Sequence, residues 1–254
     1  MRRWIVVITI IAVALTGPPA RGEQTLEVGL EHGDYSGDLE NGDGQFASFT
    51  WSQGPLWTFR ADASHETRFD DEGFGFGVGA TRNLGKVRAG VGLSSGTGDV
   101  IHPEYRFDLG ASFDLPVEGL QGTAGYTRLQ SKGDNSSDGF TVGLTAWRGG
   151  HWILGAAGRH EIGHPGSTSS NSADLSVTWF QWLRLYVGVG YRFGDVSYQL
   201  LGPTTTLVDY AETDLYATVS WHIRPGFGVN ARFDSVQNDV YDLTAARLSL
   251  FWTW

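Results

Sequence analysis

Long runs of strictly alternating apolar and polar residues constrain this chain more than any other feature. In residues 183–193, LRLYVGVGYRF, large apolar side chains occupy every second position, with Arg, Tyr and Gly between them. Residues 57–63 and 105–113 repeat the pattern. Because successive side chains of a β-strand point to opposite faces, each run predicts a strand whose two faces meet different environments.

Two fold classes contain such strands. A soluble sandwich turns its apolar faces to a core, whereas a membrane barrel turns them to lipid and its polar faces to a lumen. The runs are about ten residues long, the length of a tilted transmembrane strand, and tryptophans cluster at their ends. We therefore expect an all-β fold, a transmembrane antiparallel up-and-down β-barrel.

The pattern predicts fourteen strands, with twelve as the alternative if one strand has been split. Short links such as NLGK alternate with long polar links such as GDYSGDLENGDG, ETRFDDEG and SVQNDVYD, as in outer-membrane barrels with short periplasmic turns and long external loops. An even strand number places both chain ends in the periplasm. The expected strands are 24–33, 45–53, 56–65, 73–83, 86–95, 103–114, 119–130, 139–148, 151–162, 172–181, 183–194, 211–222, 226–235 and 242–254.

The first 22 residues predict a cleaved signal peptide, because Arg2 and Arg3 precede a short apolar segment and small residues flank Arg21. The barrel then comprises residues 23–254, without a helical membrane span. Removing residues 1–22 lowers Lys plus Arg from 18 to 15 against 28 Asp plus Glu, a net charge of −13. This acidic balance argues against nucleic acid as a partner. The absence of cysteine excludes disulfides and thiol chemistry.

The closing residues LSLFWTW predict a final strand that ends on an aromatic at the periplasmic interface. Closure against the first strand would remove both sheet edges. A terminal aromatic is also typical of the signal by which the barrel-assembly machinery selects its clients, so we expect this partner during biogenesis. The membrane-interface aromatics are predicted to be Trp57, Trp152, Trp179, Trp221, Trp252 and Trp254.

The polar stripes carry arginines and carboxylates in near balance. One interpretation is a salt-bridged, closed lumen that satisfies its own charges. The other is a path for a polar or anionic solute, read by arginines. The lumen-lining candidates are Arg60, Asp62, Arg88, Glu104, Arg106, Asp108, Arg159, Arg184, Arg192, Asp214, Arg232, Asp234 and Arg247.

Other motifs carry less chemistry. His160–His164 reads HEIGH, but it continues a period-2 run, and on a strand its histidines stand too far apart to share a zinc ion. A weak calcium candidate is the carboxylate cluster of Asp34, Asp38, Glu40 and Asp43. We expect no catalytic residues, no cofactor and no enzymatic activity. A lipid-modifying enzyme with a spatially assembled Ser/His/carboxylate set is the enzymatic alternative.

The chain resembles the YaiO family of outer-membrane β-barrels in GLEHGDYSGD (29–38), YRFDLGASFDLP (105–116), GTAGYTRLQ (122–130) and YDLTAARLSLFWTW (241–254). Trp254 stands where phenylalanine is usual in the family. The resemblance implies an outer-membrane barrel without catalytic residues, similar to barrel domains that accompany polysaccharide secretion systems.

We therefore expect a monomeric barrel in the outer membrane of a Gram-negative cell, in contact with membrane lipid and lipopolysaccharide. The first functional hypothesis is a channel or conduit for small polar solutes or saccharide, linked to surface polysaccharide export. The alternatives are a surface-interaction barrel with a closed lumen and the lipid-modifying enzyme.

Overall fold

Fourteen long antiparallel strands form one closed barrel in the computed structural model, with the order β1-β16-β15-β14-β11-β10-β9-β8-β7-β6-β5-β4-β3-β2. The structure describes residues 22–37, 39–99, 101–182, 184–196, 199–200, 206–207 and 210–254. The expected signal peptide thus lies outside the described residues, apart from Gly22. The described residues contain no helix long and apolar enough to cross a membrane.

The predicted strand number is confirmed, and the alternative of twelve is wrong. The barrel strands are β1 (Gln24–Tyr35), β2 (Gly42–Gln53), β3 (Trp57–Arg68), β4 (Asp71–Asn83), β5 (Val87–Gly96), β6 (Tyr105–Asp114), β7 (Leu120–Gln130), β8 (Ser136–Arg148), β9 (Trp152–His164), β10 (Thr168–Gln181), β11 (Leu185–Val196), β14 (Tyr210–Arg224), β15 (Phe227–Asn238) and β16 (Asp242–Thr253). A separate two-stranded sheet of β12 (Gln199–Leu200) and β13 (Thr206–Leu207) lies in the link between β11 and β14, which the alternation did not predict.

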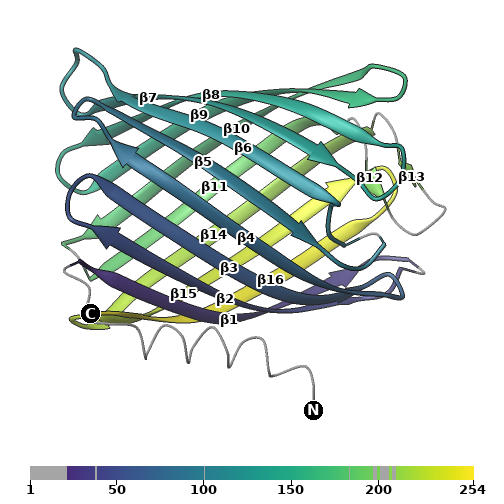
Figure 1. Cartoon of the computed structure of the whole chain (residues 1–254), viewed down its shortest axis with the longest axis horizontal. Helices are drawn as coiled ribbons and strands as arrows, with labels where there is room; N and C mark the ends of the chain where they lie inside the picture. The colour runs from purple at the N-terminus through teal and green to yellow at the C-terminus, as the bar shows by residue number, and fades with distance from the viewer. Residues whose placement is uncertain are drawn as a thin grey trace.

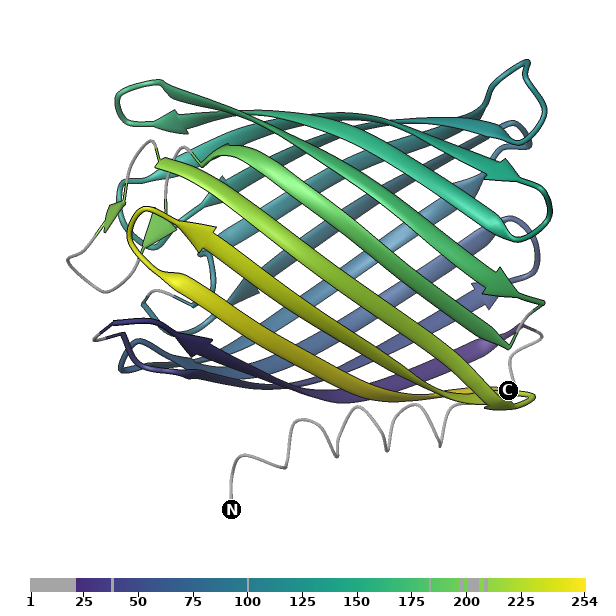
Figure 2. The same cartoon turned by 180° about the vertical axis from the view of Figure 1, so that it is seen from behind.

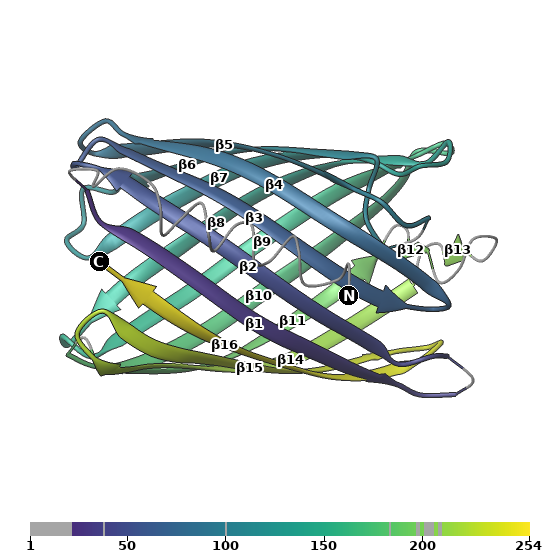
Figure 3. The same cartoon turned by 60° about the horizontal axis from the view of Figure 1, so that its bottom comes forward.

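The strands cross the barrel at a marked tilt, and β1 lies beside β16 (Figures 1 and 3). Backbone bonds from Gln24 N–H to the Trp254 carbonyl and from Trp254 N–H to the Gln24 carbonyl, both 2.9 Å, close the seam. The chain end marked C lies at the barrel end opposite β12 and β13 (Figures 1 and 2). Closure leaves no unpaired strand edge in the barrel wall, as hydrocarbon requires.

Tight links join the strands at the end that holds Gln24 and Trp254, as predicted. The link after β4 contains Gly85 at φ 84°, and the link after β14 contains Gly226 at φ 73°. Glycine adopts this left-handed conformation without the steric cost that a Cβ brings. The sequences NLGK and RPG therefore determine where these strands turn back.

At the opposite end, the expectation of uniformly long loops is wrong. Only Phe69 and Asp70 separate β3 from β4, where ETRFDDEG was expected to form a loop, and residues 239–241 separate β15 from β16. The polar residues instead extend the strands beyond the expected bounds. Hydrogen bonding between neighbouring strands persists outside the apolar layer, so polarity alone does not end a strand. An aromatic cluster stabilises this end: Tyr35 contacts Phe69 at 4.8 Å and Tyr241 at 5.5 Å between ring centroids.

The two faces of the wall differ as the alternation predicts. Large apolar side chains on one face are exposed on the isolated chain, among them Val142 (66%), Leu30 (60%) and Leu215 (58%). The residues at the alternate positions are mainly charged, hydroxyl-bearing or glycine. A continuous apolar outer face of this extent requires lipid as its solvent, so the barrel is a transmembrane one.

Candidate functional site

The lumen wall carries a repeated arrangement in which an arginine pairs with the carboxylate two residues later on its own strand. Such residues share a face, roughly 6.6 Å apart along the strand at about 3.3 Å per residue, which a guanidinium group spans. The pairs are Arg60–Asp62 (3.3 Å), Arg106–Asp108 (2.9 Å), Arg159–Glu161 (3.1 Å) and Arg232–Asp234 (2.5 Å). Local sequence alone therefore neutralises part of the lumen.

Other contacts join neighbouring strands. Arg192 on β11 lies 3.7 Å from Asp174 on β10 and 3.7 Å from Asp214 on β14. Arg247 on β16 lies 3.9 Å from Glu31 on β1 and stacks over the Phe46 ring at 3.6 Å. These interactions form a charged network over several strands, with cations and anions interleaved.

The strand registers place most predicted lumen residues on the inward face. Glu104 lies in the loop between β5 and β6, and Arg184 lies in the link between β10 and β11, so neither belongs to a strand. The others occupy inward positions: Arg60, Asp62, Arg88, Arg106, Asp108, Arg159, Arg192, Asp214, Arg232, Asp234 and Arg247.

The strand registers correct the expectation that arginines and carboxylates are nearly balanced in the lumen. The inward positions that the sequence reading left out add more carboxylates than arginines: Arg68 against Glu66, Asp71, Asp114, Glu161, Asp174 and Glu212. Glu161 and Glu212 lie near the ends of the expected strands 151–162 and 211–222, but they are absent from the expected lumen-lining residues. The two-residue period, continued through HEIGH and back from Asp214, was the signal that could have found them.

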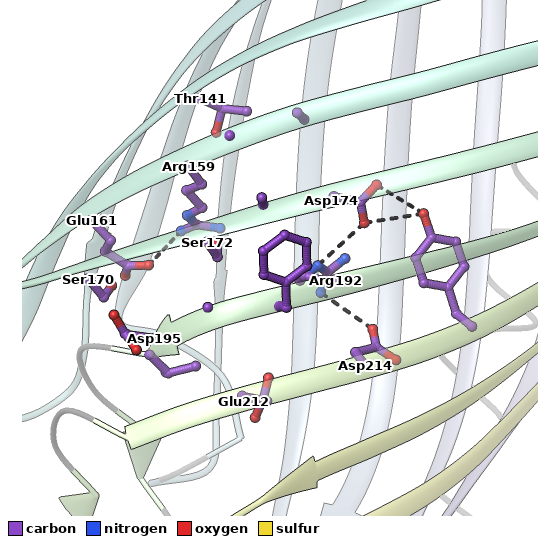
Figure 4. A pocket seen from close by; sticks show the side chains of 17 residues that line it. Thr141, Arg159, Glu161, Ser170, Ser172, Asp174, Arg192, Asp195, Glu212 and Asp214 are labelled. Atoms are coloured by element: carbon purple, nitrogen blue, oxygen red, sulfur yellow. Dashed lines mark hydrogen bonds and ion pairs between the residues drawn. The ribbon is translucent and has the colours of Figure 1, made fainter.

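The acidic excess concentrates in one pocket of about 550 Å³ between β9, β10, β11 and β14 (Figure 4). Arg159 and Arg192 line it together with Glu161, Asp174, Glu212 and Asp214, and Asp195 lies at its border with the loops. Tyr216 donates a hydrogen bond from its hydroxyl to Asp174, at 3.1 and 3.2 Å from the two carboxylate oxygens. Ser170, Ser172 and Thr141 add hydroxyl groups to the wall.

The loop between β5 and β6 reaches the lumen wall through His102. A Cβ on Gly75 would lie 2.8 Å from His102 Cε1, and one on Gly96 would lie 2.6 Å from His102 Cβ. The imidazole thus lies against inward glycines. Burial lowers the pKa of His102, and the nearby Glu66 carboxylate opposes this shift.

The predicted interface aromatics occupy outward positions at the end with the tight links. Trp152 and Trp179 are directly opposite each other in register, and Trp221 is opposite Leu185. Trp252 packs on Phe227 at 5.2 Å between ring centroids. Trp57 begins β3, and Trp254 follows β16. The arrangement is that of an aromatic girdle at one membrane interface.

The weak calcium candidate is not assembled in the described part of the chain. His32 takes both Asp43 (2.8 Å) and Asp34 (3.1 Å) as partners, and the Glu40 carboxylate accepts a hydrogen bond from the Asp70 N–H. Asp38 lies outside the described residues. Among the residues that the structure describes, no group of three or more His, Asp or Glu side chains could hold a metal ion.

Two of the histidines weighed for the enzymatic alternative have partners that are not nucleophiles. HEIGH lies within β9, and in the described structure His160 pairs with the Asn171 amide at 2.9 Å. His65 pairs with Glu72 at 2.8 Å. Neither partner is a hydroxyl that could act as a nucleophile.

The fold and the charged lumen define the class: this is an outer-membrane β-barrel. A family model for the YaiO membrane β-barrel domain matches residues 23–199, and the chain belongs to this family. A comparison with curated proteins finds no match.

Solved barrels share the fold at low sequence identity. The CymD monoaromatic hydrocarbon channel matches with a TM-score of 0.63 and 10% identity over 95% of this chain and 91% of that one. A bacterial polysaccharide outer membrane secretin matches with a TM-score of 0.55 and 7% identity over 91% of this chain and 98% of that one. A KdgM porin matches with a TM-score of 0.50 and 9% identity over 89% of this chain and 98% of that one. Several neighbours are thus channels or porins by name, but the likeness concerns the fold.

Proposed function

We propose that this barrel is a channel through which small polar solutes, saccharides among them, cross the outer membrane. The observation that supports this most directly is the inward face. It carries charged and hydroxyl side chains and, on β4 and β5, the glycines 73, 75, 77, 79, 90 and 92, several of which lie against polar side chains such as Asp62, Ser64 and His102. A barrel interior with such a wall is polar and hydrated.

The test is single-channel conductance of the refolded mature chain in planar bilayers. We expect discrete current steps. Thr141→Trp, on the inward face of β8, should reduce the conductance, whereas Val142→Trp, the next residue on the lipid face, should not. Absence of current at any voltage or salt concentration would instead support a closed barrel whose arginine–carboxylate pairs serve structure alone.

A further inference from the structure

The pocket between β9, β10, β11 and β14 has more anionic groups than its cations neutralise. Four inward carboxylates share it with the guanidinium groups of Arg159 and Arg192. Arg159 pairs with Glu161 at 3.1 Å. Figure 4 shows Arg192 between Asp174 and Asp214, with its ion pairs drawn as dashed lines. Both arginines are therefore already engaged.

Two carboxylates on β14 have unused acceptor capacity in the described part of the chain. Asp214 is buried (4% exposed), and its Oδ1 accepts no hydrogen bond from the residues that the structure describes, although its Oδ2 faces Arg192 at 3.7 Å. Glu212 accepts a 3.4 Å hydrogen bond from the Asn238 amide and, in the described part of the chain, forms no ion pair. A buried carboxylate oxygen without a donor is costly, so this site favours a ligand that donates hydrogen bonds and carries positive charge.

We propose that this pocket binds the ammonium group of a small organic cation, with Asp214 and Glu212 as its acceptors; this specifies the solute class of the proposed channel and rests on that function. The two residues share the inward face of β14, roughly 6.6 Å apart along the strand. An ammonium group offers three donors and no acceptor, and can therefore bond to both carboxylates at once. The Ser170, Ser172 and Thr141 hydroxyls serve the polar remainder of the ligand.

The probe is spermidine, titrated calorimetrically into the detergent-folded protein and, separately, added to the bilayer as a blocker of current. We expect saturable binding, with Kd raised about tenfold by Asp214→Asn and by Glu212→Gln, which corresponds to roughly 1.4 kcal/mol. Asp114→Asn is the matched control, because it removes the same charge from an inward residue at the other end of the wall. It should leave the Kd unchanged.

Asp214 is buried, so Asp214→Asn carries a risk of misfolding. Glu212 is only half-buried, so Glu212→Gln tests the site with less of that risk. Undetectable binding, or equal Kd values in all four proteins, would overturn the inference. A wild-type barrel that carries no current yet binds spermidine through Asp214 and Glu212 would refute the channel and leave the site standing. Current that spermidine does not block, without calorimetric binding, would refute the site and leave the channel standing.

Discussion

At the scale of single residues, glycine makes room for the polar network of the lumen. Gly190 on β11 lies opposite Tyr216 on β14, and a Cβ on Gly190 would lie 2.1 Å from the Tyr216 ring. The tyrosine can therefore lie flat across β11. In this position its hydroxyl reaches Asp174, and Arg232 packs over its ring at 4.6 Å.

Gly190→Ala should destabilise the barrel by about 1–3 kcal/mol, the usual cost of an overpacked site. Tyr216 must move, which breaks its hydrogen bond to Asp174. Gly110→Ala is the matched control, because its Cβ would meet nothing closer than a carbonyl at 4.0 Å. The urea concentration at the midpoint of unfolding is measured for both variants from the intensity of the folded band in unboiled gel samples. Equal midpoints for the two variants would contradict the steric role of Gly190.

At the scale of the element, successive residues of each strand face different environments, lipid on one side of the wall and the lumen on the other. On β8, Thr141 faces Arg159 in the lumen, and Val142 is exposed to lipid. The same substitution at these neighbours therefore separates the two faces within one strand, at nearly the same depth in the membrane.

Val142→Arg should lower the free energy of unfolding, and so destabilise the barrel, by about 2–4 kcal/mol. This is the cost of an arginine on the lipid face of a barrel near the membrane midplane. Thr141→Arg should cost much less, because its charge enters a polar lumen beside carboxylates. Folding into lipid vesicles across a urea series measures the difference. Equal losses at both positions would show that the outer face of β8 is not in contact with lipid.

The loop between β5 and β6 is the element whose docking should depend on pH. Its Ile101 N–H donates to Asp71 at 3.3 Å, and Lys132 donates to the Gly98 carbonyl. His102 Nε2 is buried and has no hydrogen-bond partner among the described residues. Burial lowers the pKa of His102, so a released loop takes up a proton more readily than the docked one.

Docking should therefore be complete above the usual histidine pKa of about 6.5 and weaken as pH falls below it. Hydrogen exchange at residues 97–99, 101, 102 and 104, corrected for intrinsic rates, should be faster at pH 5 than at pH 8. His102→Gln should remove most of this difference. Identical protection of the wild-type loop at both pH values would contradict the prediction.

At the scale of the whole molecule, the barrel exists only as a closed ring. β16 pairs with both β15 and β1 along nearly their full lengths. Without it, the free edges of β1 and β15 would expose unpaired backbone groups to hydrocarbon, each costing several kcal/mol.

Deleting residues 242–254 should abolish folding, whereas Trp254→Phe should retain it, because the backbone bonds between residues 24 and 254 do not depend on the side chain. The measurement is the shift in gel migration between boiled and unboiled samples after refolding in detergent. A truncated chain that still shows this shift would mean that the remaining strands close by themselves.

The sequence by itself determined the strand number, the two faces of the wall and the tight turns. Each depends on local rules: period-2 alternation, glycine at positive φ and the length needed to cross a bilayer. The arginine–carboxylate pairs such as Arg60–Asp62 are local in the same sense, since both residues lie on one face of one strand.

Only the tertiary structure decided which charges meet across strands and how long the loops are. Arg192 joins Asp174 and Asp214 because the registers of β10, β11 and β14 align them, and register is fixed by the whole ring. ETRFDDEG became strand except at Phe69 and Asp70, because β3 and β4 supply hydrogen-bond partners to each other's backbone. The sequence does not predict the acidic pocket for the same reason. Its residues are separated along the chain, and hydrogen bonding between strands brings them together.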